Sequence, residues 1–483
     1  MTDPGPVPGR LRVAIVAANT FEYESRLLKT ASTLAGDGHT VTVVAFAGPG
    51  LPAVASLGDR VELRRVTLDR RIGTGLRPLP ASIRSLVLRA SGLGPDAEAL
   101  PVGPAHGADR LRAPLRRGLE ILATIRRGDA WAAAVAAAAP HAEIVHAKAL
   151  IALPVARDAA RLTAGRGGRF VYDVADLHSE SARLVKLPGV VRAAIRRRER
   201  GLVRAAAGVL AATPSMAAEI VRRFGVARPV VLLNCPPAWH PATPGLVPSD
   251  RLRRAVDAAL RAGPTRPTGG TAPAATNAAG PRPRPIVLYQ GAFRVDQGIE
   301  ELVAAADDPG LIAAGAVVVF LGFGLLAPWL AGEAARRPDR MVVLPAVPED
   351  ELLDWTAGAD VAFVGAPPRT LNQRLTLPNK LFQALMAGVP IVVGAGTEHC
   401  RLAEADGVGR CCDVDSPRSI AAAIGELLAL PPADRDALRR RCRSTALDRY
   451  SWEVARVGLL DLYRRLAATG IEAGQADEAR AGR

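Results

Sequence analysis

The stretch 377–394, LPNKLFQALMAGVPIVVG, constrains the fold of this chain more than any other. Its pattern predicts a loop, a helix over 380–386 closed by Gly388, and a buried strand over 391–393. A helix in this setting presents its N-terminus at the edge of a parallel sheet, where main-chain N–H groups and the helix dipole attract anions.

Two side chains of this helix suggest a ligand. Lys380 adds a positive charge in the first turn, and Gln383, three residues later, lies on nearly the same face. Together they predict a site for a diphosphate with a ribose beside it, as in a nucleotide-diphosphate sugar. A buried helix between two strands of any α/β protein is the alternative.

The same segment resembles the donor-binding helix of the GT-B fold retaining glycosyltransferases, the family-4-like group (glycosyl transferases group 1). The family commonly carries a Glu, seven residues and a second Glu that binds the ribose hydroxyls, and this chain has Leu375 and Gln383 at those places. Relatives with the LPNKLFE variant also lack the first Glu. A carboxylate accepts from both hydroxyls, whereas the Gln383 amide offers one acceptor and two donors.

Length and cysteine usage bound the architecture. The 483 residues, 49% of them hydrophobic, predict two domains of roughly 200 residues each. The five cysteines form no CxxC pair or His-flanked cluster, so we expect neither a zinc site nor a disulfide framework, and a reducing cytoplasm fits. The N-terminus MTDPGPVPGR has no apolar core, so no secretory signal is expected.

The uncharged segment 310–332 is long enough to span a bilayer. Its Gly and Pro interruptions and the neighbouring β/α alternation favour instead a buried strand over 317–321 between two helices.

The formal net charge of +15 is unevenly placed, with arginines concentrated in 64–89 and 192–204 among apolar residues at roughly helical spacing. Such a basic amphipathic surface can lie on anionic lipid, each cation contributing about 1 kcal/mol. Nucleic acid is a rival partner, but no recognition motif or interleaved aromatics support it. A solvated Arg-rich face is the remaining alternative.

The chain opens with a strand over 11–17, a helix and a strand over 41–46, which predicts a parallel sheet. The intervening loop lacks GxGxxG, which argues against a dinucleotide oxidoreductase. Its segment AANTFEYESRLLK resembles the family's NNPFxYDSRVLK loop. The resemblance implies that Asn19 and Arg26 face the cleft, with Glu24 on the acceptor side and Arg26 holding an acceptor or donor oxygen. Helix capping and local ion pairs are the alternative.

Later loops of the first half depart from the family pattern. Lys148 stands in HAKA where relatives read HAHD, and VADLHSE resembles SHELxxE with Ala175 in place of the His and Asp176 in place of the Glu. We predict that Asp176 positions the sugar and that His178 or Lys148 substitutes for the missing imidazole. An exposed His178 without a catalytic role is the alternative.

The segment 262–285 has almost no large apolar side chain, which predicts a disordered insertion beside the linker. The strand expected over 286–290 then opens the second half. The turn after it resembles the family's G-R-L-x-x-x-K-G, whose Arg and Lys neutralise the diphosphate. Ala292 and Gln297 occupy those two places, and Arg294 lies in the same loop.

The resemblance covers 11–466 in collinear order and implies an α/β fold of two Rossmann-like doubly wound domains facing across a cleft (GT-B). It predicts an N-terminal acceptor-side domain over 1–245, a helix and disordered linker over 246–284, a donor-binding domain over 285–449, and a helix returning to the first domain over 450–483. It also implies the site residues. The donor would be bound by Gln290, Gly291, Arg294, Gln297, Gly298, Phe323, Val347, Pro378, Asn379, Lys380 and Gln383. Catalysis would fall to Asp176, Arg26 and His178, with Asn19, Glu24 and Lys148 on the acceptor side.

These expectations combine into a function. We expect transfer of a sugar, with retention, from a nucleotide-diphosphate sugar to a lipid-linked or polysaccharide acceptor in cell-envelope or exopolysaccharide synthesis. The enzyme would lie in the cytoplasm, at the inner face of the plasma membrane, and its leaving diphosphate would be stabilised by helix dipole and cations without metal or cofactor.

Two alternatives stay open. Ala175, Ala292, Gln297 and Gln383 stand where relatives carry chemistry, so a catalytically degenerate GT-B scaffold that assembles with an active transferase is the first. A nucleotide-sugar epimerase on the same fold is the second, and it would need acid/base carboxylates that the sequence does not identify.

Overall fold

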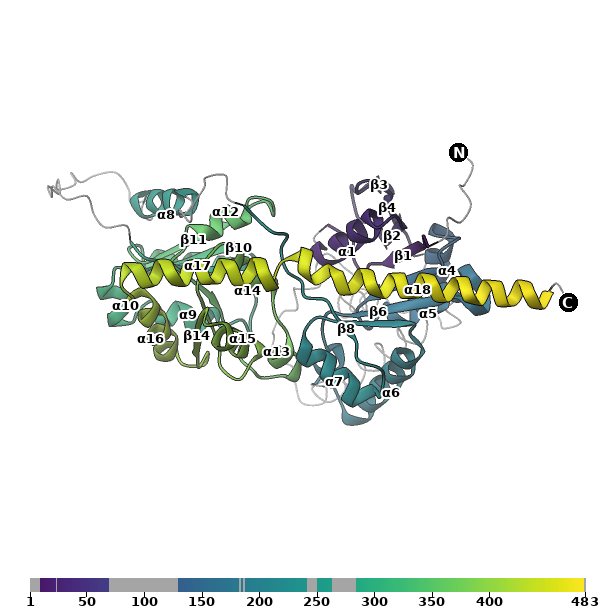
Figure 1. Ribbon diagram of the computed structural model, residues 1–483. Helices are drawn as coiled ribbons and strands as arrows, with labels where there is room; N and C mark the ends of the chain where they lie inside the picture. Colours follow the sequence, from purple (N-terminus) through teal and green to yellow (C-terminus); the bar gives the residue numbers. More distant parts are fainter. Residues whose placement is uncertain are drawn as a thin grey trace, which may run out of the picture. The chain divides into compact units, whose positions relative to one another are not determined.

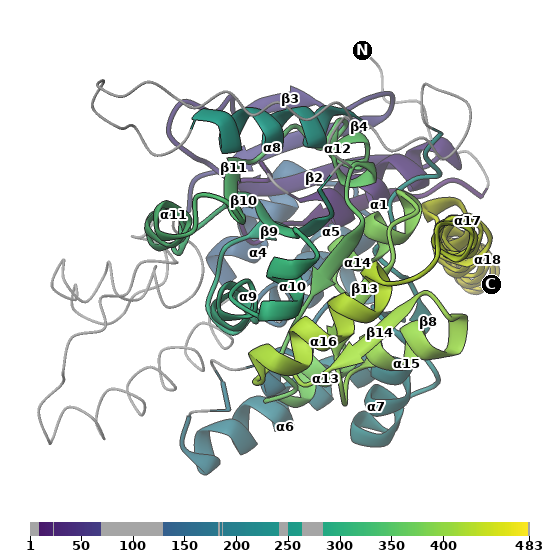
Figure 2. The ribbon, with the colours of Figure 1, turned by 90° about the vertical axis from the view of Figure 1, so that its left-hand side faces the viewer.

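The chain forms two compact units in the computed structural model, which describes residues 9–22, 24–68, 129–181, 184–185, 187–240, 250–262 and 284–481 (Figures 1 and 2). The first unit comprises Met1–Leu233, Thr370–Asn372 and Ala455–Arg483, and the second comprises Asn234–Arg369 and Gln373–Val454. Each unit is built on a sheet of mainly parallel strands, so the α/β class predicted from the sequence is confirmed.

The first unit has an 8-stranded sheet in the order β3-β4-β2-β1-β5-β6-β7-β8, parallel except where β3 pairs with β4. Its strands are β1 (Arg12–Val16), β2 (Thr40–Phe46), β3 (Val54–Ser56), β4 (Val61–Val66), β5 (Ile144–Lys148), β6 (Arg169–Val174), β7 (Gly208–Ala211) and β8 (Val230–Val231). Its helices are α1 (Ser25–Gly36), α4 (Asp129–Ala138), α5 (Leu153–Ala164), α6 (Gly189–Ala205) and α7 (Pro214–Phe224), with short 3₁₀ turns η1 (Gly165–Gly167) and η2 (His178–Glu180).

The second unit has a 6-stranded parallel sheet in the order β11-β10-β9-β12-β13-β14. Its strands are β9 (Ile286–Ala292), β10 (Val317–Phe323), β11 (Met341–Pro345), β12 (Val361–Val364), β13 (Ile391–Gly394) and β14 (Gly409–Cys412). Its helices are α8 (Asp250–Ala262), α9 (Ile299–Ala305), α10 (Pro309–Ala313), α11 (Ala327–Arg336), α12 (Leu352–Ala357), α14 (Asn379–Met386), α15 (Glu398–Asp406), α16 (Pro417–Leu428) and α17 (Pro432–Arg449). Two helices include residues of both units: α13 (Leu371–Leu375) and α18 (Trp452–Ala481).

Strand order creates a switch point in each sheet. In the first, β1 lies between β2 and β5, and in the second, β9 lies between β10 and β12. The connections from these central strands leave on opposite sides, so their carboxyl ends are where open α/β sheets bind ligands. The loop after β1 and the end of β5 therefore meet in one unit, and the loops after β9 and β12 meet in the other.

Local sequence explains several element boundaries. Thr213 caps α7 by accepting a hydrogen bond from the Met216 amide at 3.0 Å, Pro214 follows at the first helical position, and Gly225 ends the helix in the left-handed region at φ 63°. The first five residues of β10 are buried between neighbouring strands, which confirms the buried strand expected within 310–332. Among the described residues, no helix is long and apolar enough to cross a membrane.

Three features differ from expectation or lie beyond what can be compared. A short helix, α13, lies ahead of the loop that leads into α14 and was not expected from the sequence, although LNQRL consists of residues that tolerate helix well. Cys400 and Cys411 form a disulfide, so the expectation of no disulfide framework was wrong. The partners meet because α15 packs against β14, which cysteine spacing does not reveal. Most of the arginine-rich stretch over 64–89 and most of the insertion over 262–285 lie outside the described residues.

Candidate functional site

The donor helix predicted from the sequence is α14, and its first turn lies beside the end of β9 in the second unit. Pro378 precedes it and supplies no side-chain cap, so the N–H groups of the first turn have no side-chain acceptor from that residue. The Lys380 ammonium lies 3.9 Å from the centre of the Tyr289 ring, in cation–π geometry. Tyr289 lies in the middle of β9, so this contact joins the cation to the central strand of the sheet.

Lys380 has an unusual charge state for a lysine. Burial of its ammonium group, with a smaller contribution from the charge of Arg294, lowers its pKa to about 7. An anion that binds beside this amine favours its protonated form and so raises its pKa again. The resulting ammonium group and the anion then attract each other. The position is therefore suited to a phosphate group.

Gln383, the predicted ribose contact, belongs to a chain of polar side chains beneath the helix. Gln290 Nε2 donates to Gln383 Oε1 at 3.0 Å, and Thr356 Oγ1 donates to Gln290 Oε1 at 2.6 Å. Gln290 is 4% exposed and Thr356 is fully buried, so this network fixes the amide planes. The Gln383 oxygen is directed at Gln290, which turns its NH₂ group to the opposite side as a donor.

Glycines let the main chain approach closely at the end of β9. Gly322 pairs with Gly291, and a Cβ added at Gly322 would meet the Gly291 carbonyl oxygen at 1.9 Å. Gly298 starts α9 at φ 70°, where a side chain would also collide with Val414. The predicted residues Gly291 and Gly298 are thus explained by backbone geometry that shapes the turn at the carboxyl edge of the sheet.

The remaining predicted donor residues lie around this edge with varied roles. Asn379 accepts a hydrogen bond from Asn234 Nδ2 at 2.6 Å, and Gln297 donates to the Asp296 carbonyl at 3.2 Å. The Gln297 amide is therefore turned back on its own loop. Arg294 and Phe323 are exposed, and Val347 is partly buried just after β11.

A second set of predicted residues comes together at the switch point of the first unit. Glu24 Oε1 accepts from Asn19 Nδ2 at 2.5 Å, and Glu24 Oε2 accepts from Lys148 Nζ at 2.6 Å. Asn19 follows β1 and Lys148 ends β5, so the carboxyl ends of two neighbouring strands place both beside Glu24. The structure thus unites the three residues assigned to the acceptor side.

Asp176 and His178 lie next to one another in the loop after β6. Asn372, which belongs to the same unit, donates to Asp176 Oδ1 at 3.0 Å and accepts from the Leu177 amide at 2.6 Å. The His178 ring nitrogen Nδ1 lies 3.0 Å from the Asp176 carbonyl oxygen. His178 therefore stabilises the loop that carries Asp176 through this contact.

Arg26 is placed differently from the sequence-based expectation. Its side chain is 3% exposed, and it donates to both oxygens of Asp173, at 2.7 and 2.6 Å, and to the Leu232 carbonyl at 2.8 Å. All of these partners are protein groups, so the guanidinium joins α1 to β6 and the segment after β8. This geometry gives Arg26 a structural role in place of the predicted substrate contact.

Sequence reasoning missed several side chains that the structure brings to these sites: Asn234, Tyr289, Thr356 and Asn372. Each reaches its partner through tertiary packing across many residues, so no local motif signals it. Tyr289 was the most accessible to prediction, because it directly precedes Gln290 in β9.

Comparison with known proteins identifies the chemistry of the second unit. Residues 284–430 match the family model of the glycosyl transferases group 1. The chain carries a glycosyltransferase domain. The enzyme class predicted from the sequence, a transferase, is confirmed, and the matched segment of this glycosyltransferase contains every predicted donor residue. No curated protein sequence matches the chain.

Solved structures show the fold of the whole glycosyltransferase. Sucrose-phosphate synthase from Thermosynechococcus elongatus aligns with a TM-score of 0.62 at 15% identity, covering 95% of this chain and 100% of that one. The α,α-trehalose 6-phosphate synthase of Burkholderia multivorans aligns with a TM-score of 0.59 at 13% identity, covering 96% and 98%. Anabaena HepE, solved with UDP and glucose, aligns with a TM-score of 0.55 at 13% identity, covering 96% and 100%. These likenesses confirm the predicted GT-B class of two Rossmann-like domains.

Proposed function

We propose that this glycosyltransferase moves a sugar, with retention, from a nucleotide-diphosphate sugar to a lipid-linked or polysaccharide acceptor in cell-envelope or exopolysaccharide synthesis. The observation that carries the proposal is the start of α14. There a cation of lowered pKa, Lys380, lies over Tyr289, and one turn later Gln383 is fixed by Gln290. HepE, a neighbour of the same fold, is described in complex with UDP, which supports a nucleotide-sugar donor.

We assign donor binding to residues of the second unit, and positioning of the sugar and the acceptor to residues of the first. In the second unit, Lys380 and Arg294 would neutralise the leaving diphosphate together with the N-terminus of α14, and Gln383 would donate to the ribose. In the first unit, Asp176 would position the sugar, and the Asn19, Glu24 and Lys148 cluster would hold acceptor hydroxyls. Charge on the leaving group would then be stabilised by the helix dipole and side-chain cations without a metal ion.

Donor binding tests the proposal directly. Isothermal titration with UDP-, GDP- and ADP-sugars should give a signal with one class of base, and Lys380→Ala should weaken it by about 10- to 150-fold, the value of one charge-assisted bond. Arg410→Ala removes a cation from the same unit that pairs with Glu426 on the surface, and it should leave donor affinity unchanged. Binding of no donor would favour the scaffold alternative.

A basic face of helix α6 motivates a second part of the proposal, contact with a membrane surface. Helix α6 buries Val191, Ile195 and Leu202 and exposes Arg197 and Arg200 on its other side. Val190, at its start, is 77% exposed. We infer that this basic face holds the enzyme peripherally on anionic lipid at the cytoplasmic side of the plasma membrane, where a lipid-linked acceptor would be presented.

Liposome sedimentation tests the membrane proposal. The protein should bind vesicles that contain anionic lipid at low salt in preference to zwitterionic vesicles, and the double variant Arg197→Glu, Arg200→Glu should lose this preference. Arg410→Glu, the control, should retain it. Equal binding to both kinds of vesicle would end the membrane proposal without touching donor binding.

A further inference from the structure

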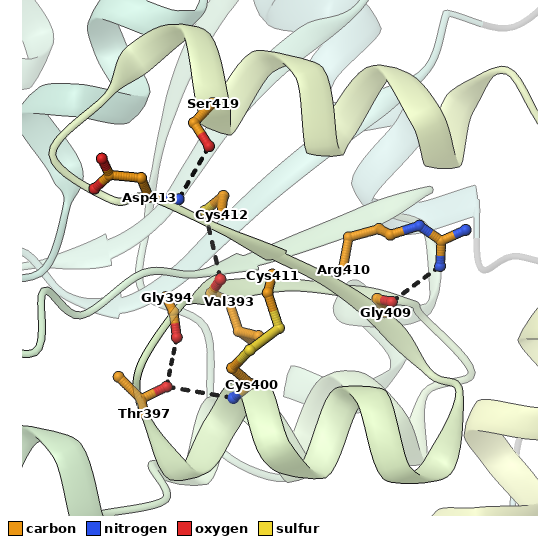
Figure 3. The surroundings of a disulfide bond; sticks show 10 residues. All are labelled: Val393, Gly394, Thr397, Cys400, Gly409, Arg410, Cys411, Cys412, Asp413 and Ser419. Atoms are coloured by element: carbon orange, nitrogen blue, oxygen red, sulfur yellow. Dashed lines mark hydrogen bonds between the residues drawn. A yellow bond between two sulfur atoms is a disulfide. The ribbon is translucent and has the colours of Figure 1, made fainter.

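The disulfide between Cys400 and Cys411 fastens the first turn of α15 to β14 (Figure 3). Cys400 is the third residue of α15, and its amide donates to the capping hydroxyl of Thr397, which in turn donates to the Gly394 carbonyl. Cys411 lies on β14, paired with Val393 of β13. The two Cα atoms are 5.4 Å apart, within the ordinary range for a disulfide.

These two cysteines differ from the other thiols of the chain. Cys235, Cys412 and Cys442 are buried, and burial raises the pKa of Cys412 and Cys442 to about 12, which makes them inert. Cys411 is partly exposed, so small thiols can reach its sulfur, whereas Cys400, 8% exposed, lies buried in the first turn of α15. The pair is therefore open to thiol–disulfide exchange.

The helix that the disulfide fastens, α15, packs against β13, the strand that follows the donor helix α14. His399, next to Cys400, is 1% exposed, and burial lowers its pKa to about 4, with carbonyl groups of Thr376 and Val364 opposing the shift and Lys380 adding to it. Its neutral ring thus lies near the end of β12, the residues that lead into α14, and the Lys380 ammonium. The first turn of α15 is thus connected to α14 through β13, against which both helices pack.

We propose that Cys400 and Cys411 form a thiol–disulfide switch that sets how tightly the donor binds. The inference rests on the proposed function, since it concerns the regulation of that same site. At the cytoplasmic location proposed above, a disulfide is usually a transient or redox-sensing bond, so we assign this one a regulatory use. The oxidised form holds His399 and Lys380 in place, and reduction loosens them.

The reduced Cys400 and Cys411 thiols are oxidised to the disulfide by a low-molecular-weight disulfide, R–S–S–R. The Cys411 thiolate attacks one sulfur of R–S–S–R, forming a mixed disulfide and releasing R–S⁻, which takes up the Cys411 proton. The Cys400 thiolate then attacks the Cys411 sulfur, forming the protein disulfide and releasing the second R–S⁻, which takes up the Cys400 proton. Two electrons pass from the cysteine pair to the reagent, and excess R–SH reverses both steps.

The test uses the full chain in fully oxidising and fully reducing glutathione buffers. Alkylation after denaturation, read by mass spectrometry, should label Cys400 and Cys411 in the reduced protein and neither in the oxidised protein. Titration with the panel of UDP-, GDP- and ADP-sugars should show affinity at least about 5-fold weaker in the reduced state, the lower end of typical coupling between sites. Hydrogen exchange of 398–406 should be slower in the oxidised state.

Variants separate the switch from general redox effects. Cys411→Ser and, as a second variant in case of poor folding, Cys411→Ala should bind the donor with the reduced-state affinity in both buffers. Cys442→Ala, a matched control at a buried thiol outside the pair, should keep the redox difference.

Other results would contradict either the switch or the proposed function. Alkylation of Cys400 and Cys411 in the oxidising buffer, or equal donor affinity in both buffers, would overturn the switch. Binding of no donor in either state would reject the proposed function. In that event redox-dependent exchange at 398–406 would still support a switch in this turn, and redox-independent exchange would overturn it.

Discussion

Arg26 and Asp173 form a bidentate ion pair in the core of the first unit, with Nε and Nη2 donating to the two carboxylate oxygens at 2.7 and 2.6 Å. Both side chains are almost completely buried, and the third Arg26 donor group binds the Leu232 carbonyl. A buried pair of this kind contributes through mutual satisfaction, so removal of one partner leaves an uncompensated charge in the core.

We therefore predict that Arg26→Met destabilises the protein by about 3–5 kcal/mol, the usual cost of breaking a buried ion pair from one side. Urea unfolding measures this loss. The matched control is Arg222→Met, which removes an exposed partner of Glu219 and should cost at most about 1 kcal/mol. An Arg26→Met protein with unchanged stability but no transferase activity would contradict the structural role and restore the substrate contact.

The same pair predicts how acid acts on the protein. Burial opposes ionisation of Asp173, but the charge and hydrogen bonds of Arg26, helped by His146, override it and hold its pKa well below the usual range. Because the folded-state pKa is depressed, the pair's contribution is complete above about pH 4, the pKa of an unfolded Asp, and declines as pH falls further. The difference in stability between wild type and Asp173→Asn should shrink over that acid range and stay constant above it.

Glu199 on α6 predicts the opposite pH dependence. Its carboxyl group is buried, and burial raises its pKa to about 7 although Ser179 and Arg223 favour ionisation. Between about pH 4.5 and 7 the folded protein therefore binds more protons than the unfolded chain, and this group's contribution falls by roughly 3 kcal/mol as pH rises. Glu199→Gln should remove that slope and be more stable than wild type at about pH 8.

The measurement is urea unfolding of wild type and variant at several pH values between about 5 and 8. Glu219→Gln serves as the control, because the hydrogen bond from Arg222 lowers the pKa of Glu219, which therefore does not titrate in this range. That control should keep the wild-type slope. A slope unaffected by Glu199→Gln would show that Glu199 stays ionised when folded.

These residues show which features of the structure local sequence rules predict and which they do not. The helix and strand at 379–394 follow from local rules, because Gly388, Pro390 and the β-branched run fix their ends, and Lys380 and Gln383 follow from spacing on one helix face. The role of Arg26 does not follow in the same way. Whether its guanidinium faces solvent or the core depends on Asp173, which lies 147 residues away in the chain.

The Cys400–Cys411 disulfide and the polar network beneath α14 could not be predicted from the sequence for the same reason. Cys400 and Cys411 meet because α15 packs against β14. Thr356, on α12, reaches Gln290 on β9, far away in the chain. Local periodicity predicts which faces are buried but not which buried side chains become neighbours. The motif residues were therefore predictable, and the residues that orient them were not.

Lys380 predicts a pH-dependent donor affinity. With a pKa of about 7, the free side chain is mostly neutral at about pH 8, whereas a bound diphosphate requires the ammonium form. Binding should therefore take up about 0.9 proton at that pH, and affinity should fall about tenfold per unit above pH 7 until the pKa of the complex is reached. Titration in two buffers of different ionisation enthalpy measures the uptake. Lys380→Arg stays charged and should bind without this dependence, and a flat wild-type profile from about pH 6 to 9 would contradict the prediction.

Gln383 predicts a gain of function by one substitution. In Gln383→Glu one carboxylate oxygen can still accept from Gln290 Nε2, as Oε1 does now at 3.0 Å, and the other can accept from a ribose hydroxyl. Because charge-assisted hydrogen bonds are roughly twice as strong as neutral ones, donor affinity should rise by about 3- to 10-fold in calorimetry. Thr356→Val keeps the shape below the network but leaves Gln290 Oε1 without its donor, and it should cost about 1–3 kcal/mol in stability. Unchanged or weaker binding by Gln383→Glu would place the ribose away from this residue and return α14 to a purely structural role at that position.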